Sequence, residues 1–434
     1  MSLDVLVDKV LMHPRPWILT GAGISTESGI PDFRSADGLW EKVDPIENFS
    51  TWALYNNPEG FYTHGIPLFK QVLEANPNLG HIILGELQTK RFFGPIITQN
   101  VDSLHQKGGA KWVYEIHGHL RTATCISCHK TVVTLDELFK LVEDKEIPPK
   151  CQCGGILKPD VILFGDTMPE DFQDAIRLIR SYRTTDNMII TIGSSLTVSP
   201  INTFPSEFDS LAIINKSVTI LDRDAEIIIK GSAGAIMQKI RARLVELNNG
   251  EELVSLPAGF LPGRLTTIIL DLWESFLTKK KTFNRGEQLN KIMADLLLVE
   301  KLFLNYPRMD KRSGIEKYMI NSNLIKLQKI KNEMIEMRGN AKNTNGYMPR
   351  SINDIINSHY KALIIYTRQY NSEPEIVKEL VLQIVGFIGL YKHMEILDMQ
   401  EFENSFVDEL YDKILKITNK YELDIDMVKA LDNY

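Results

Sequence analysis

Short apolar runs that alternate with helical patterns are the feature that most constrains the fold of this chain. They extend from Trp17 to about Arg241, and such alternation is typical of a parallel β-sheet covered by helices. We therefore expect an α/β fold over this part. The predicted strands are Trp17–Thr20, Pro95–Thr98, Met188–Ile192, Leu211–Ile214 and Ile227–Ile229.

Several of these runs end in small or polar residues: Gly21-Ala22-Gly23, Gln99-Asn100, Gly193-Ser194-Ser195 and Asn215. Ligands of open parallel sheets bind beyond the carboxyl ends of the strands, so these residues should line one site. Bare backbone at Gly21 and Gly23 lets amide groups approach a diphosphate, although Thr26 occupies the third glycine position of the dinucleotide fingerprint. The alternative is an ordinary strand-to-helix turn, but the second small turn at 193–195 favours a dinucleotide.

The four cysteines of the chain form two close pairs, Cys125-x-x-Cys128 and Cys151-x-Cys153. Two such pairs separated by a loop can surround one tetrahedral Zn²⁺, and four cysteine ligands leave no open position for water. We expect one structural zinc ion in an insertion at about 121–158. The alternative is four unrelated buried thiols; a disulfide is less favoured because nothing marks the chain for export.

The sequence changes character after Val245. A linker is predicted at 246–264, where Asn, Gly and Pro cluster, and residues 265–434 are expected to form an all-helical domain of unassigned role. Its helical patterns cover about 265–283, 286–306, 315–338, 351–370, 374–396 and 402–432. This domain is a candidate for protein–protein contact or self-association.

Composition excludes some classes of protein. The formal net charge of −7 gives no overall attraction to nucleic acid, so direct nucleic-acid binding is not expected. Neither a signal peptide nor an apolar run of about 20 residues is evident, which predicts a protein without a membrane span. We expect an intracellular protein, cytoplasmic or nuclear.

Polar side chains near the strand ends supply the candidate chemistry. Gln99, Asn100 and Asp102 follow an apolar strand, and such clusters usually satisfy a polar ligand. Arg34 lies in a loop just beyond Gly21–Ser25 and offers a planar fork for phosphate, although a solvated surface arginine is the ordinary alternative. His117 precedes Gly118 and could act as a base near neutral pH, whereas a lone histidine is more often structural.

These motifs occur together and in one order along the chain. They are Gly-Ala-Gly-Ile-Ser (21–25), Gly29-Ile-Pro-Asp-Phe-Arg34, Thr98-Gln-Asn-Val-Asp102, His117-Gly118, the two cysteine pairs, Lys158-Pro-Asp160, Phe164-Gly165-Asp166, Gly193-Ser-Ser-Leu196 and Ile214-Asn215. The series resembles the sirtuin family of NAD-dependent protein deacylases. The resemblance covers about residues 1–245 and does not reach the helical part.

The resemblance implies a Rossmann-like large domain with an inserted zinc-ribbon domain, and NAD meeting an acyl-lysine peptide between them. His117 would be the general base on the ribose hydroxyls, and Asn100 and Asp102 would shape the nicotinamide pocket. The acyl group would pass from lysine to ADP-ribose as nicotinamide leaves. Residues implied to contact NAD are Gly21, Ala22, Gly23, Ser25, Asp32, Phe33, Arg34, Gln99, Asn100, Asp102, Gly193, Ser194, Ser195, Asn215 and Ser232. The acyl-lysine protein substrate would pair with Val161, Ile162, Leu163, Phe164 and Gly165.

One departure bears on substrate choice. Leu39 and Lys42 stand where the family branch that prefers acidic acyl groups carries a Tyr and an Arg, so succinyl and malonyl groups are not expected. Two rival functions remain. The first is an NAD hydrolase or mono-ADP-ribosyltransferase with a C-terminal sensor or oligomerisation domain, and the second is a non-enzymatic scaffold that only senses NAD. The intact cysteine quartet and peptide segment argue against the first, and the presence of both His117 and Asn100 argues against the second.

Overall fold

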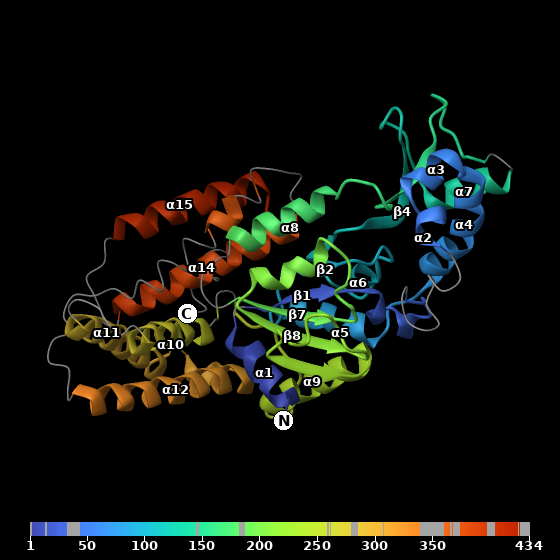
Figure 1. The fold of residues 1–434 in the computed structure, drawn as a ribbon. Helices are drawn as coiled ribbons and strands as arrows, with labels where there is room; N and C mark the ends of the chain where they lie inside the picture. The colour runs from blue at the N-terminus through green and yellow to red at the C-terminus, as the bar shows by residue number, and fades with distance from the viewer. Residues whose placement is uncertain are drawn as a thin grey trace.

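A six-stranded parallel sheet forms the centre of the computed structural model (Figure 1), with strand order β3-β2-β1-β7-β8-β9. The strands are β1 Trp17–Thr20, β2 Ile96–Thr98, β3 Val113–Glu115, β7 Met188–Ile192, β8 Ser210–Asn215 and β9 Ile227–Lys230. All five neighbouring pairs are parallel. Every residue of β1, β2 and β7 is buried, as expected where helices cover both faces of a parallel sheet. The predicted α/β fold is confirmed.

The structure describes residues 2–13, 15–32, 44–144, 147–181, 187–257, 260, 262–278, 285–306, 308–338, 360–364, 367, 374–396, 404–423 and 425. The motif residues Phe33, Arg34, Leu39 and Lys42 lie outside these ranges, as does most of the predicted 351–370 helix.

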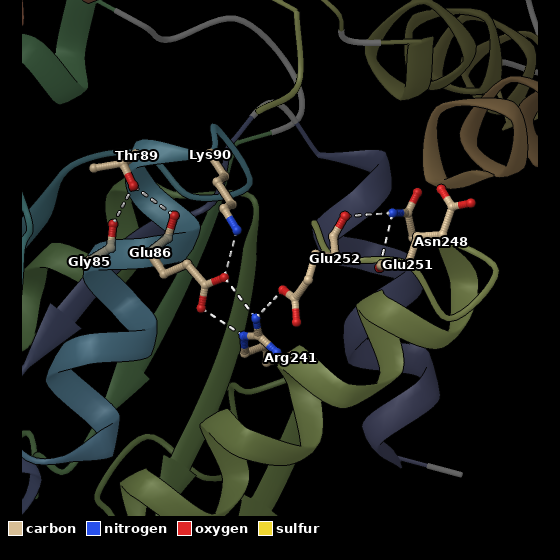
Figure 2. Close-up of polar contacts among 8 residues, drawn as sticks. All are labelled: Gly85, Glu86, Thr89, Lys90, Arg241, Asn248, Glu251 and Glu252. Carbon is tan, nitrogen blue, oxygen red and sulfur yellow. Dashed lines mark hydrogen bonds and ion pairs between the residues drawn. The ribbon is translucent and has the colours of Figure 1, made fainter. Parts of the chain in front are cut away.

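Helices α1 (Ser2–Met12), α5 (Leu79–Thr89), α8 (Glu170–Ser181) and α9 (Ala233–Leu247) accompany this sheet, with the short α6 (Leu104–Lys107) after β2. α5 packs along α9. Arg241 of α9 joins the two helices by donating two hydrogen bonds to Glu86 of α5, at 2.7 and 3.1 Å. Arg241 also donates to Glu252, and Lys90 donates to Glu86 (Figure 2). This charged cluster links both helices to the segment that leaves α9.

A second, smaller unit has its own apolar core. Its three-stranded antiparallel sheet has the order β5-β4-β6, with β4 Gly118–Cys125, β5 Val132–Thr134 and β6 Leu157–Val161. Helix α7 (Leu135–Glu143) lies between β5 and β6 in the chain. Helices α2 (Pro45–Asn48), α3 (Thr51–Asn56) and α4 (Pro58–Glu74) complete it. Tyr62 of α4 donates to the carbonyl of Leu157 at 2.6 Å within this core. The unit is thus built from two stretches of chain, of which the sequence indicated one.

The C-terminal helices are α10 (Pro262–Thr278), α11 (Arg285–Leu304), α12 (Gly314–Arg338), α14 (Pro374–Ile396) and α15 (Asn404–Lys420). They lie on the side of the sheet away from α3, α4 and α7 (Figure 1), where α10 and α12 contact α1. α10 begins at Pro262, inside the predicted linker, because proline is well suited to the first turn of a helix. α15 ends at Lys420 rather than near 432, since Leu423 turns back to donate to the Thr418 carbonyl at 3.1 Å.

The segment between α9 and α10 packs several of its apolar side chains into the core. Leu253, Leu256 and Phe260 are 3%, 4% and 1% exposed and join an apolar cluster that runs from the sheet into the helical region. The Leu256 amide also donates to the carbonyl of Lys90 at 3.0 Å. The helical region therefore shares its core with the α/β part. None of the helices within the described ranges is long and apolar enough to cross a membrane.

Candidate functional site

Two glycine turns meet at the carboxyl edge of the central sheet. The turn Ala22–Ile24 follows β1, and the Gly23 amide donates to the carbonyl of Gly193, the residue after β7, at 2.8 Å. A Cβ added at Gly23 would lie 2.7 Å from that carbonyl oxygen, and one at Gly193 would lie 2.4 Å from the amide nitrogen of Ile24. Gly193 also has φ +65°, a conformation that favours glycine. Glycine is required here so that the two turns can touch and present backbone at the edge of the sheet.

Asn100, Asp102 and Ser25 form a buried hydrogen-bonded group beside these turns. Asn100 Nδ2 donates to the Gly21 carbonyl at 3.2 Å and to Ser25 Oγ at 3.0 Å. Ser25 Oγ donates in turn to Asp102 Oδ2 at 2.6 Å. Burial raises the pKa of Asp102, although the bonds from Ser25 and the Leu104 amide act in the opposite direction. The network fixes the orientation of the Asn100 amide and ties the loop after β2 to the loop after β1.

His81, in α5, contacts the Asn100–Asp102–Ser25 group through Ser25. The Asn78 amide donates to His81 Nδ1 at 3.3 Å, so the neutral ring carries its proton on Nε2, 3.4 Å from Ser25 Oγ. Burial lowers the pKa of His81 to about 4, which keeps the ring neutral near pH 7. Sequence reasoning did not single out this residue for the site. The signal that was available is its position three residues after Asn78, the place of a capping-box partner at a helix start.

His117 stands where the chain passes from the large sheet into the small unit. It follows β3 and precedes β4, and its Nδ1 lies 3.0 Å from the carbonyl oxygen of Gln99. A carbonyl oxygen can only accept a hydrogen bond, so Nδ1 carries the proton of the neutral ring. Nε2 is then the nitrogen with a lone pair that can take up a proton. A general base would use this lone pair.

The 161–165 segment is joined through its backbone to His117 and to the start of α3. The Ile162 amide donates to the His117 carbonyl at 2.8 Å. Phe164 donates to the carbonyl of Phe49 at 3.2 Å and accepts from the Thr51 amide at 3.0 Å. Val161 and Leu163 are buried, whereas the Phe164 side chain is 44% exposed. This segment thus lies next to the histidine, with the Phe164 side chain open to solvent.

The other predicted NAD contacts lie along the same edge of the sheet. Gln99 Nε2 donates to Ser194 Oγ at 3.0 Å, which joins the loops after β2 and β7. Ser195 follows directly, Asn215 ends β8 and Ser232 precedes the first residue of α9. Ala22 and Asp32 are both half-buried in the loop region after β1. The structure therefore brings the loops after β1, β2, β7 and β8 to one edge, as the order of the strands requires.

The four cysteines lie together at the far end of the small unit. Their Sγ atoms are all within 4.8 Å of one another, a group that could hold one metal ion. The Cys125–Cys153 and Cys128–Cys151 separations are 3.6 and 3.9 Å, close to the roughly 3.8 Å edge of a tetrahedron with Zn–S bonds of about 2.3 Å. The Cys125–Cys151 and Cys151–Cys153 separations are shorter, 3.2 and 2.8 Å. A Cβ at Gly155 would lie 2.6 Å from Cys125 Sγ, so glycine makes room for the cluster. β4 separates the cluster from His117, and at about 3.3 Å per residue its length places Cys125 roughly 25 Å from the histidine along the strand.

Comparison with known proteins identifies the part of the chain that carries this site. Residues 21–200 match the family model described as the Sir2 family. The NAD-dependent protein deacetylase 2 of Caldanaerobacter subterraneus subsp. tengcongensis is 46% identical over 51% of this chain and 88% of its own length. The NAD-dependent protein deacetylase of Saccharolobus solfataricus is 38% identical over 56% of this chain and its whole length.

Solved structures give the same result. A Sir2 complex with a deacetylated p53 peptide and 3′-O-acetyl ADP ribose is similar with a TM-score of 0.52 at 32% identity, over 56% of this chain and 98% of that chain. A Sir2 complex with a p53 peptide and NAD⁺ is similar with a TM-score of 0.50 at 32% identity, over 58% of this chain and all of that chain. Each of these matches covers a little more than half of the present chain.

Proposed function

This chain belongs to the Sir2 family, and we propose on that premise that it is an NAD-dependent protein-lysine deacetylase. The reaction transfers the acetyl group of an acetyl-lysine side chain to ADP-ribose and releases nicotinamide and O-acetyl-ADP-ribose. NAD, when bound, supplies the ADP-ribosyl acceptor and the nicotinamide leaving group. Its contacts are assigned to the loops that meet at the carboxyl edge of the sheet.

The observation that carries the proposal is the hydrogen bond between His117 Nδ1 and the Gln99 carbonyl, 3.0 Å long. It selects the tautomer in which Nε2 accepts protons, and this nitrogen is assigned as the base for a ribose hydroxyl. Gln99 is also bonded to Ser194 of the glycine turn after β7, so the group that orients the base touches a loop assigned to NAD. General bases of this kind typically contribute about 10²–10⁴-fold to the rate.

Asn100 and Asp102 are assigned to the nicotinamide end of the site. The Asn100 side-chain amide donates its two hydrogens to the Gly21 carbonyl and to Ser25 Oγ. Its Oδ1 is therefore the atom that can accept a hydrogen bond from the ligand. Asp102 accepts a hydrogen bond from Ser25 and so fixes the position of its hydroxyl. Gly21, Ala22, Gly23, Ser25 and Asp32 are assigned to the diphosphate and nicotinamide side, with Phe33 and Arg34 beyond the described residues. Gln99, Gly193, Ser194, Ser195, Asn215 and Ser232 are assigned to the riboses and adenine.

The protein substrate is assigned to the backbone of Val161–Gly165. An extended peptide can add to such a segment as a strand, and the main-chain hydrogen bonds that hold it do not depend on the peptide's side chains. The hydrogen bond from the Ile162 amide to the His117 carbonyl then fixes the position of the substrate-binding segment relative to the base. Acidic acyl groups are disfavoured in this proposal because Leu39 and Lys42 replace the residues that would recognise a carboxylate.

The cysteine quartet is assigned one structural zinc ion. Four thiolates complete a tetrahedral site, so zinc would stabilise the small unit and would take no part in the reaction. Cys125 and Cys151 belong to the apolar core of that unit, which explains how metal binding supports its fold.

The test uses the purified full chain with NAD and an acetyl-lysine peptide, with nicotinamide and O-acetyl-ADP-ribose followed by mass spectrometry. Both products should form in equal amounts and only when peptide is present. His117→Ala should lower turnover at least a hundredfold, whereas the exposed α4 residue His64 should tolerate the same change. Release of free ADP-ribose at the same rate without peptide would instead establish the NAD hydrolase.

A further inference from the structure

A bidentate ion pair brackets His117 on both sides along the chain. Arg121, in β4 of the small unit, donates from Nη1 and Nη2 to the two carboxylate oxygens of Glu115, in β3 of the large sheet, at 2.8 and 2.6 Å. Ile116 and His117 form the turn between these two strands. The pair therefore closes the turn that carries the proposed base and joins the two sheets where the chain crosses.

The same guanidinium reaches the loop that carries Asn100 and Asp102. Arg121 Nη1 also donates to Ser103 Oγ, and Ser103 Oγ lies 3.2 Å from Glu115 Oε1. Ser103 has φ +55°, so its backbone adopts the left-handed conformation that non-glycine residues seldom occupy. The Leu120 amide donates to the Val101 carbonyl at 3.0 Å and holds β4 against the same loop. Arg121 thus links β3, the start of β4 and the loop after β2.

The carboxylate of Glu115 depends on this partner. Its side chain is 7% exposed, whereas that of Arg121 is 45% exposed. A buried carboxylate that loses its cation either takes up a proton or moves toward water. Its backbone is held by a bond from the Glu115 amide to Asp171 Oδ2 at 2.8 Å, so the side chain and its neighbours would have to move.

We propose that Arg121 is a positioning residue: through Glu115 and Ser103 it holds His117 in register with the Asn100–Asp102 loop. This inference rests on the proposed function, because His117 and Asn100 are the groups that it aligns. Arg121 reaches neither glycine turn among its described contacts, so it should affect turnover more than NAD affinity.

The experiment compares Arg121→Gln, Glu115→Gln and the double variant in the full chain. Arg121→Gln should lower kcat about tenfold or more, while KM for NAD stays within about twofold of the original value. Because both residues act through one contact, the double variant should be no slower than the slower single variant. Arg180→Gln removes another arginine–carboxylate pair, with Glu207 on the surface of the large domain, and should leave kcat unchanged.

A second readout does not require turnover. The ring C–H resonances of the nine histidines, assigned with the help of His117→Ala, should show a shift of His117 in Arg121→Gln and an unmoved His64. If Arg121→Gln fails to fold, the double variant serves in its place, because it leaves no uncompensated carboxylate. Unchanged kcat together with an unchanged His117 resonance would overturn the inference. A parent protein without any peptide-dependent turnover would refute the proposed function, and the histidine resonances would still decide the role of Arg121.

Discussion

Glu379 of α14 offers a direct measure of how strongly the helical region is held against the α/β part. Its carboxylate accepts from Arg15 Nη1 and from Arg91 Nε, the latter 3.2 Å from both oxygens. Arg15 precedes β1 and Arg91 follows α5, so one glutamate joins two separate segments of the large domain to α14. We expect Glu379→Gln to weaken this attachment, because an amide keeps the shape and one acceptor but loses the charge.

The magnitude follows from exposure. The side chains of Arg15, Glu379 and Arg91 are 9%, 23% and 20% exposed, so the group lies between a buried ion pair and a surface one. Breaking a buried pair costs about 3–5 kcal/mol and losing an exposed pair about 0–1 kcal/mol. An intermediate value of about 2–3 kcal/mol is expected for Glu379→Gln. At roughly 2–4 °C per kcal/mol, this corresponds to a fall in Tm of about 4–12 °C.

Urea and thermal unfolding, followed by circular dichroism at pH 7.5, measure the effect. Glu409→Gln is the matched control, since Glu409 and Lys413 form a pair on α15 that is 64% and 47% exposed and should contribute under about 0.5 kcal/mol. Equal unfolding midpoints for the parent and Glu379→Gln would refute the reasoning.

The dependence on pH is a further check of the same pair. Burial acts to raise the pKa of Glu379, but Arg15 and Arg91 outweigh it and hold the pKa below the ordinary value of 4.5. A depressed carboxyl pKa stabilises the fold above the unfolded pKa, and this stabilisation is lost as the pH falls through the folded pKa. The stability difference between parent and variant should therefore be constant between pH 6 and 8 and should shrink below about pH 4.5.

Three other predictions concern the site and the small unit. Cys128→Ser should lower bound zinc below one ion per chain by elemental analysis and reduce the Tm of the small unit; full zinc content in this variant would argue against the four-cysteine site. Gly23→Ala should weaken NAD binding in calorimetry and cost about 1–3 kcal/mol of stability, because its Cβ would lie 2.7 Å from the Gly193 carbonyl oxygen; unaltered NAD affinity would contradict the role of the close contact. The His81 ring should not titrate between pH 5.5 and 8 by NMR, since burial lowers its pKa to about 4; a midpoint near 6.5 would contradict the buried network beneath Ser25.

Much of the fold was predictable because its signals are local. Continuous apolar runs predicted five strands of the central sheet, and the parallel pairs confirm the α/β class. Helical periodicity predicted α11, α12 and α14 with ends within two residues of those observed, whereas α10 begins at Pro262 and ends at Thr278 instead of covering 265–283. Family membership could likewise be inferred from motifs, because each motif is a short stretch of adjacent residues. These properties depend on neighbours in the chain, which a sequence displays directly.

The composition of the small unit was less accessible. Its cysteine pairs and the strands around them were expected, but helices α2, α3 and α4 come from a separate stretch at 45–74. They join it because apolar side chains such as Phe61 and Phe69 pack into its core, and Tyr62 donates to the carbonyl of Leu157, 95 residues away. Nothing local in 45–74 marks that partner.

The sequence by itself determined which chemical groups this protein has: a histidine before a glycine, an asparagine and an aspartate after a strand, two glycine turns and two cysteine pairs. Tertiary structure alone decided what each group can do. Ser25 meets Asp102 across 77 residues, and the Gln99 carbonyl selects the His117 tautomer across 18. It also decided that Arg121 closes on Glu115 and that Glu379 lies between two arginines. The physical reason is that hydrogen bonds and ion pairs act over about 3 Å in space, a distance that only the packed fold establishes between residues far apart in the chain.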